Sequence, residues 1–154
     1  MAREYSVGGR SAATAATANH VGAALWNASS TRALWVTQIS WAKTVATADN
    51  IALARISARG TAGSTVTPVQ QNDATYDAAP PTGALLDLAA YSAQPTVIST
   101  AAYMWRWHMP AAIGAGFILP WPGALLVPPG AGLALLTPPA TVLQPADVTF
   151  WWYE

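Results

Sequence analysis

Runs of alternating apolar and polar residues predict β-strands along most of the chain. The segment 33–41 alternates over its whole length and is rich in β-branched and aromatic residues, which favour strands. Segments 21–26, 51–58 and 64–70 predict three more strands, the last at a sheet edge because Pro68 cannot donate a ladder hydrogen bond. For 51–58 a helix remains open, since alanine, leucine and arginine are good helix formers.

The second half of the chain continues this pattern, with prolines between the strands. Segment 97–108 alternates and predicts one long strand, whereas 84–91 could be a short helical turn or a strand. The asparagine, aspartate, proline and glycine content of 72–83 predicts a loop. Further short apolar runs follow at 117–119, 124–127, 132–137 and 147–153. The prolines between these runs exclude a helical interpretation of the last third.

Together these elements predict an all-β fold. About eight short strands with almost no helix are typical of a β-sandwich, and eight strands favour a jelly roll. Because 154 residues fit one domain, we expect a single jelly-roll-like β-sandwich over residues 21–154. Residues 1–20 are mostly small and polar, so we expect an extended N-terminal arm that becomes ordered on a neighbouring chain.

The chain carries unusually little charge. Only 9% of its residues are charged, against about 25% in an ordinary globular chain, and seven basic residues cancel seven acidic ones. The lack of a positive excess argues against binding to nucleic acid or to an anionic membrane surface. The uncharged segment 111–136 is long enough to span a bilayer, but its prolines exclude a membrane helix. A surface so poor in charge predicts that other chains cover part of it.

Motifs for catalysis or metal binding are missing from the sequence. It has no cysteine, its two histidines (His20 and His108) are far apart, and it contains neither a G-x-S-x-G elbow nor a glycine-rich phosphate loop. We therefore expect no enzymatic activity, no catalytic residue, no metal ligand and no cofactor. Asn27-Ala28-Ser29 matches the glycosylation pattern, a triplet that also occurs often by chance.

Tryptophan is abundant, with eight residues in the chain. The first interpretation is a sandwich core, which suits the strand positions of Trp35, Trp41, Trp105 and Trp107. The second is a subunit interface, where tryptophan, tyrosine, methionine and arginine are enriched. The residues that we expect at such an interface are Trp151, Tyr153, Trp121 and Arg106. A platform for stacking sugar rings is the third interpretation.

Segment 147–154 places large aromatic residues on both faces of one predicted strand. Phe150 lies on one face, and Trp151 and Tyr153 lie on the other. A strand covered on one side only would alternate apolar with polar residues. We therefore expect this strand to lie centrally in its sheet, with Phe150 in the core and the other face against a neighbouring subunit.

Four stretches carry a resemblance to a known group of proteins: LWNASSTRALWV, TVTPVQQNDA, PPGAGLAL and the closing WWYE. In this order they resemble small jelly-roll structural proteins of tailed bacteriophages, including capsid decoration proteins and head or tail appendage modules. The resemblance covers roughly residues 21–154 and has its best features at Pro129-Gly130 and in the aromatic final strand. It implies a non-enzymatic virion protein, commonly trimeric.

We therefore expect a capsid decoration (cementing) protein that assembles as a homotrimer on the virion surface after synthesis in the host cytoplasm. Its expected partners are copies of itself and the major capsid protein or another virion protein, with neither nucleic acid nor membrane. The alternative is a glycan-binding or receptor-binding module of a phage tail or fibre. Tryptophans covered by neighbouring chains favour the decoration protein, whereas a row of exposed tryptophans in a groove favours glycan binding.

Overall fold

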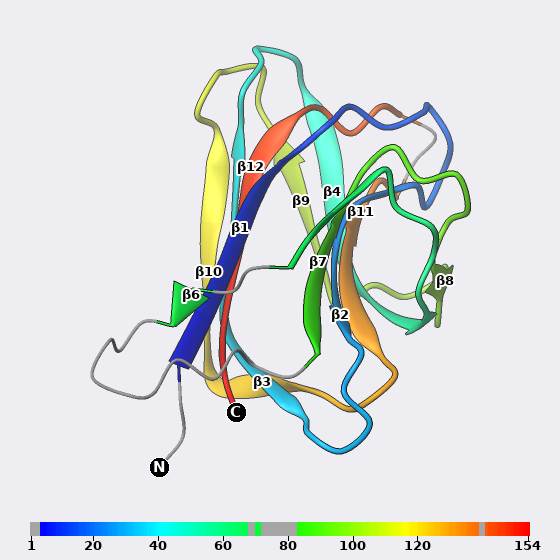
Figure 1. Ribbon diagram of the computed structural model, residues 1–154. Helices are drawn as coiled ribbons and strands as arrows, with labels where there is room; N and C mark the ends of the chain where they lie inside the picture. The colour runs from blue at the N-terminus through cyan, green and yellow to red at the C-terminus, as the bar shows by residue number, and fades with distance from the viewer. Residues whose placement is uncertain (1–3, 68–69, 72–82, 139–140) are drawn as a thin grey trace.

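The computed structural model describes residues 4–67, 70–71, 83–138 and 141–154, which form two antiparallel β-sheets packed face to face (Figure 1). The strands of this part of the chain are β1 (Glu4–Ser11), β2 (Val21–Asn27), β3 (Leu34–Lys43), β4 (Asp49–Ala58), β5 (Ser64–Val66), β6 (Gln70–Gln71), β7 (Ala84–Leu88), β8 (Thr96–Val97), β9 (Trp105–Met109), β10 (Gly116–Val127), β11 (Gly132–Leu136) and β12 (Ala146–Tyr153). The described residues contain no helix, and therefore none that could span a membrane. The structure confirms the prediction of an all-β fold with two packed antiparallel sheets.

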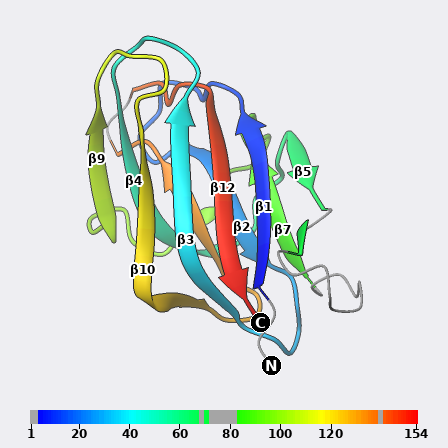
Figure 2. The same ribbon diagram turned by 90° about the vertical axis from the view of Figure 1, so that its left-hand side faces the viewer.

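The two sheets are named here by their position in Figure 2. The front sheet has the strand order β10-β3-β12-β1-β6, and Figure 2 shows its long strands face-on. The back sheet has the order β5-β7-β2-β11-β4-β8, and β9 also pairs with β4. Because β12 lies between β1 and β3, the prediction of a central final strand is confirmed.

The inward faces of both sheets form one apolar core, since alternate side chains of a strand point to opposite faces. Phe150 and Trp152 of β12 and Trp41 of β3 are among its largest fully buried side chains, which confirms the expected burial of Phe150. Gly22 of β2 leaves room for the buried side chain of Leu143, because a Cβ on this glycine would clash with Leu143 Cδ2.

The outer faces of the two sheets differ in what covers them. The outer face of the back sheet is apolar, and its residues Ala54, Ile56 and Leu136 are buried beside Tyr91 and Tyr103 of the segment that follows β7. The chain therefore covers this face with its own residues. No described segment crosses the outer face of the front sheet in Figure 2.

The predicted N-terminal arm is wrong for residues 4–11. They form β1, which pairs with β12 over its whole length, from Glu4 opposite Tyr153 to Ser11 opposite Ala146. Tyr5 and Val7 are 2% and 3% exposed and belong to the core, and the Tyr5 ring stacks on Trp152. The ordering of this strand comes from its own chain rather than from a neighbour.

Val7→Asp is accordingly expected to destabilise the fold, because it places an unpaired charge among buried apolar side chains. The midpoint of thermal unfolding, followed by circular dichroism, should fall steeply, whereas the exposed Ala12→Asp should leave it nearly unchanged. Equal midpoints for the two variants would contradict the burial of Val7 and favour an N-terminal arm outside the core.

Other predicted elements change in extent. Segment 97–108 is not one strand, because residues 98–104 form an irregular connection between β8 and β9. The segments 51–58 and 84–91, for which a helical structure was also open, form the strands β4 and β7. The two apolar runs at 117–119 and 124–127 join into β10, which bulges between Pro120 and Leu125. Most of the loop predicted at 72–83 lies outside the described residues.

Candidate interaction surface

The outer face of the front sheet is built from four strands, whose ladders shift register between Gln38 and Val36 of β3 and between Pro120 and Leu125 of β10. Residues directly opposite one another across β1, β12, β3 and β10 form four rows. The rows are Arg10–Asp147–Ala42–Gly116, Gly8–Thr149–Ser40–Ile118, Ser6–Trp151–Gln38–Pro120 and Glu4–Tyr153–Trp35–Leu126. We call these sixteen residues the front face.

The two middle rows of the front face contain no charged residue, and the face carries several large apolar side chains. Its charged residues are Glu4 in one end row and the exposed pair Arg10 and Asp147 in the other. The Arg10 guanidinium donates to both Asp147 oxygens, at 2.7 and 3.0 Å, and this bond lowers the pKa of the carboxyl. Because this pair is exposed, we assign it little stabilising free energy.

Exposed apolar groups are concentrated on β3 and β10 of this face. Trp35 is 39% exposed, Leu126 40% and Ile118 69%. The rings of Trp35 and Tyr153 stack on each other in the end row, with 6.2 Å between their centroids. Large apolar side chains exposed on one sheet face are typical of a surface that contacts another molecule.

A shallow hollow of about 400 Å³ lies at one corner of the front face. It is lined by Ser40, Trp41, Ala42, Gly114, Gly116, Phe117 and Ile118. The small residues of β3 and β10 produce it, since neither Gly116 nor Ala42 fills the space beside Ile118. No described charged side chain lines this hollow, so its chemistry suits an uncharged partner.

The structure brings together two of the four predicted interface residues. Trp151 and Tyr153 lie on the front face, both partly exposed. Trp121 instead packs against the core at the edge strand β10, and Arg106 lies on β9 of the back sheet, with its guanidinium carbon 5.7 Å from the Tyr103 ring centre. Contact of any of them with a neighbouring subunit stays a prediction.

Four aromatic residues close the open edge of the sandwich between β9 and β10. Trp107 stacks on Phe117 with 4.1 Å between centroids, and Trp105 stacks on Trp107 and meets Trp121 edge-on. Trp105 remains 48% exposed. Of the predicted core set Trp35, Trp41, Trp105 and Trp107, Trp41 is therefore the only fully buried member.

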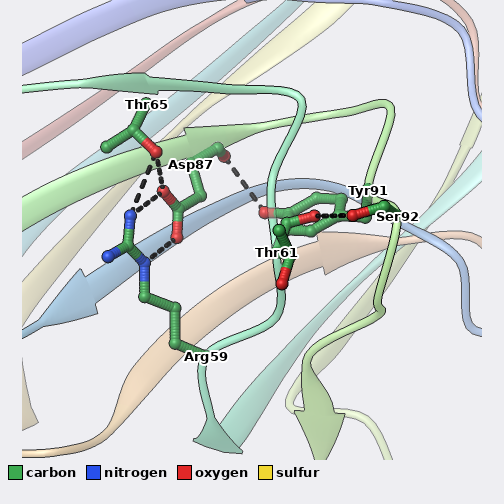
Figure 3. A network of polar contacts seen from close by, with 6 residues as sticks. All are labelled: Arg59, Thr61, Thr65, Asp87, Tyr91 and Ser92. Carbon is green, nitrogen blue, oxygen red and sulfur yellow. Dashed lines mark hydrogen bonds and ion pairs between the residues drawn. The ribbon is translucent and has the colours of Figure 1, made fainter.

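A buried carboxylate near β5 and β7 binds an arginine (Figure 3). Arg59 donates from Nε and Nη2 to the two oxygens of Asp87, at 2.6 and 2.7 Å, and Thr65 donates to the same carboxylate at 2.6 Å. The Tyr91 hydroxyl donates to the Asp87 carbonyl, and burial raises the pKa of this phenol. Since these contacts satisfy both carboxylate oxygens, we assign this network a structural role in tying the β4–β5 connection to β7.

A second buried ion pair joins the ends of β3 and β4. The side chains of Lys43 and Asp49 are 0% exposed, with 3.6 Å between Nζ and Oδ1. Lys43 also donates to the carbonyls of Thr47 and Pro110, and Asp49 Oδ2 accepts from the Gln144 amide at 3.0 Å. Burial raises the pKa of Asp49 although Gln144 and Lys43 both act to lower it. The ion pair thus bonds to the segments that hold Thr47, Pro110 and Gln144, at one end of the sandwich.

Asn27, the asparagine of the glycosylation triplet, is fully buried. Its amide donates to the carbonyls of Arg32 and Val127, at 2.8 and 3.0 Å, and its Oδ1 accepts from the Ser29 amide. A side chain used in this way cannot carry a glycan in the folded chain.

Asn27→Asp is expected to destabilise the fold by about 2 kcal/mol or more, because the carboxylate turns an acceptor toward two carbonyl oxygens and leaves them unpaired. Chemical denaturation should show the loss, and Asn50→Asp, at a half-buried residue bonded to His108, serves as the control. A denaturation midpoint for Asn27→Asp equal to that of Asn50→Asp would refute a stabilising role for the hydrogen bonds from the Asn27 amide to Arg32 and Val127.

Within the described ranges, no group of three or more histidine, cysteine, aspartate or glutamate side chains is arranged to hold a metal ion. Comparisons with protein-family models, curated proteins and solved structures find no match to this chain.

Proposed function

We propose that this chain is a non-enzymatic structural protein of a tailed-bacteriophage virion, which decorates and cements the capsid shell as a homotrimer. Its partners are copies of itself and the major capsid protein or another virion protein. By burying apolar surface across the boundaries between capsomers, it raises the free energy needed to separate them. The observation that carries this proposal is the front face, a sheet surface that no described segment crosses and whose two middle rows hold no charge, on a chain that covers its other sheet itself.

The strand order supports a jelly roll as the form of this sandwich. In chain order, β1, β3, β10 and β12 belong to the front sheet, and β2, β4, β9 and β11 belong to the back sheet. The late strands insert between the early ones: β12 lies between β1 and β3, and β11 lies between β2 and β4. Interleaving of this kind is what two Greek keys wound together produce. We propose that these eight strands are the frame and that β5, β6, β7 and β8 extend it.

The distribution of tryptophan gives little support to the alternative of a glycan-binding module. Trp35 lies on the front face and Trp105 at the β9–β10 edge, so the exposed tryptophans of the described residues do not form one row. Trp105 with its aromatic neighbours is the part of the molecule that a sugar ring could stack on.

The experiment that tests the proposal compares particles of the phage that encodes this chain, assembled with and without its gene. We expect electron cryomicroscopy to find the protein on the shell, and the shell without it to open at a lower temperature. Glycan-array binding is measured alongside for the wild type and for Trp105→Ala. Absence of the protein from the shell would overturn the decoration role, and glycan binding lost in Trp105→Ala would support the alternative.

A further inference from the structure

We propose that the side chains of Lys43 and Asp49 condense into an amide bond between Nζ and Cγ, which joins the end of β3 covalently to the start of β4. This inference goes beyond the proposed function and does not depend on it. It starts from the lysine: Lys43 is the single lysine of the chain, and its side chain is 0% exposed. Lysine is almost never fully buried unless it is paired, so the contacts of this one amine decide what it does.

The contact between the two side chains differs from that of a well-made ion pair. Lys43 Nζ lies 3.6 Å from Asp49 Oδ1, beyond ordinary hydrogen-bond length, and this oxygen accepts no hydrogen bond within the described part of the chain. In the network of Figure 3, by contrast, Arg59 donates to both oxygens of Asp87 at 2.6 and 2.7 Å. Two buried charges that lack such bonds do not recover the free energy of removing them from water. Loss of both charges is therefore favoured here.

Three backbone groups orient the pair for condensation. Nζ donates to the carbonyls of Thr47 and Pro110, which hold two of its hydrogens and leave the third position for the carboxyl of Asp49. On the far side, Asp49 Oδ2 accepts from the Gln144 amide at 3.0 Å. Groups held in a reactive geometry behave as if at effective concentrations of up to about 10⁵–10⁸ M.

The condensation balances without any further reagent. Burial raises the pKa of Asp49 and favours its neutral form, so a proton moves from Nζ to Oδ1. The Nζ lone pair then bonds to Cγ, and the carbonyl electron pair moves onto Oδ2, where the Gln144 N–H stabilises the negative charge. As the carbonyl re-forms, the Cγ–Oδ1 bond breaks, and Oδ1 leaves as water with its own proton and a second proton from Nζ. The amide keeps one N–H for one of the two carbonyls.

Burial also protects the product. Both side chains are 0% exposed, so the water that would hydrolyse the amide is kept out. The groups that assist the reaction come together only in the folded chain, because they belong to four separate segments. The ion pair is therefore the state of the newly folded chain, and we expect the amide to accumulate from it on standing.

The test follows the purified full chain during incubation for weeks below its unfolding temperature. Intact mass spectrometry should show a species lighter than the unmodified chain by one water, in a rising fraction. After unfolding, a protease specific for lysine should no longer cut this species, because its single lysine is acylated. The matched control Ala90→Lys adds a lysine at an exposed residue, and its incubated chain should be cut after residue 90 but not after Lys43.

A second set of measurements separates the amide from another dehydration, since ring closure of an aspartate onto its own backbone also releases one water. Tandem mass spectrometry of wild-type peptides should place the loss in a branched peptide that joins Lys43 to Asp49. Lys43→Met and the double variant Lys43→Met/Asp49→Leu should keep their full mass. An unchanged wild-type mass with complete cleavage after Lys43 overturns the proposal, as does a loss of water that persists in Lys43→Met. Attachment to shells enters none of these measurements, so the decoration role is tested separately.

Discussion

Replacing Phe150 with alanine is expected to lower the free energy of unfolding of the protomer by about 3–5 kcal/mol. The side chain is 0% exposed and lies on the central strand β12, between Val7 of β1 and Ile39 of β3 in the ladder. Truncation loses the transfer free energy of the ring and leaves a cavity that the flanking strands cannot close, since both are held in register. Chemical denaturation followed by tryptophan fluorescence measures the loss.

The neighbouring residue provides the matched contrast. Trp151 lies on the opposite face of the same strand and is partly exposed, so Trp151→Ala should change protomer stability much less. If the front face is an interface, this variant should instead weaken association by about 2 kcal/mol or more, as interfacial tryptophans do. Unchanged association and shell occupancy would remove Trp151 from the interface and leave it as surface open to a ligand.

The second large effect is expected at the buried ion pair. Lys43→Met should cost about 3–5 kcal/mol at neutral pH, because it leaves the Asp49 carboxylate buried without its cation. The double variant Lys43→Met/Asp49→Leu removes both charges and should recover most of this loss. Equal stability of the single and double variants would show that the cost comes from lost packing of the lysine stem rather than from the stranded charge.

The pH dependence of this pair follows from the direction of the Asp49 shift. Burial raises the pKa of Asp49 in the folded chain above its value in the unfolded chain. A raised carboxyl pKa favours folding most below the unfolded pKa, and this contribution is lost as the pH rises through the folded pKa. In Lys43→Met the pKa of Asp49 should rise further, because the nearby cation is gone. The loss in free energy of unfolding caused by this substitution should therefore shrink as the pH falls. A pH-independent difference between Lys43→Met and wild type would contradict this.

The strand pattern of the sequence predicts the centre of the sandwich well and its edges poorly. Segment 147–153 is apolar on both faces because β12 packs on the core and carries Trp151 and Tyr153 outward, and that composition is visible without coordinates. The sequence does not predict the strand at residues 4–11, because its glycines and serines weaken the alternation of apolar and polar residues. Tyr5 and Val7 are two positions apart, so both point into the core, and this alternation was the available clue.

A β-bulge interrupts the alternation of inward and outward side chains in β3. Trp35 and Trp41 are six residues apart, so an even count puts them on the same face, yet Trp41 is buried and Trp35 lies on the front face. The ladder with β12 shifts between Gln38 and Val36, which leaves Thr37 as an extra residue and reverses the faces beyond it. A bulge depends on the neighbouring strands, so the sequence of one segment does not reveal it. Trp35 was therefore missed as a member of the candidate surface.

The pairing of β1 with β12 has a consequence for how the chain reaches its fold. Arg10 and Asp147 meet across 137 residues of sequence, and β1 otherwise pairs only with the two residues of β6 among the described strands. We therefore expect β1 to lack the strand that pairs along its whole length until β12 has been synthesised. Partners this distant in sequence are slow to find each other, and an unpaired apolar strand edge is prone to aggregate in the meantime. Slower translation of the segment between β1 and β12 is therefore expected to lower the yield of soluble protein.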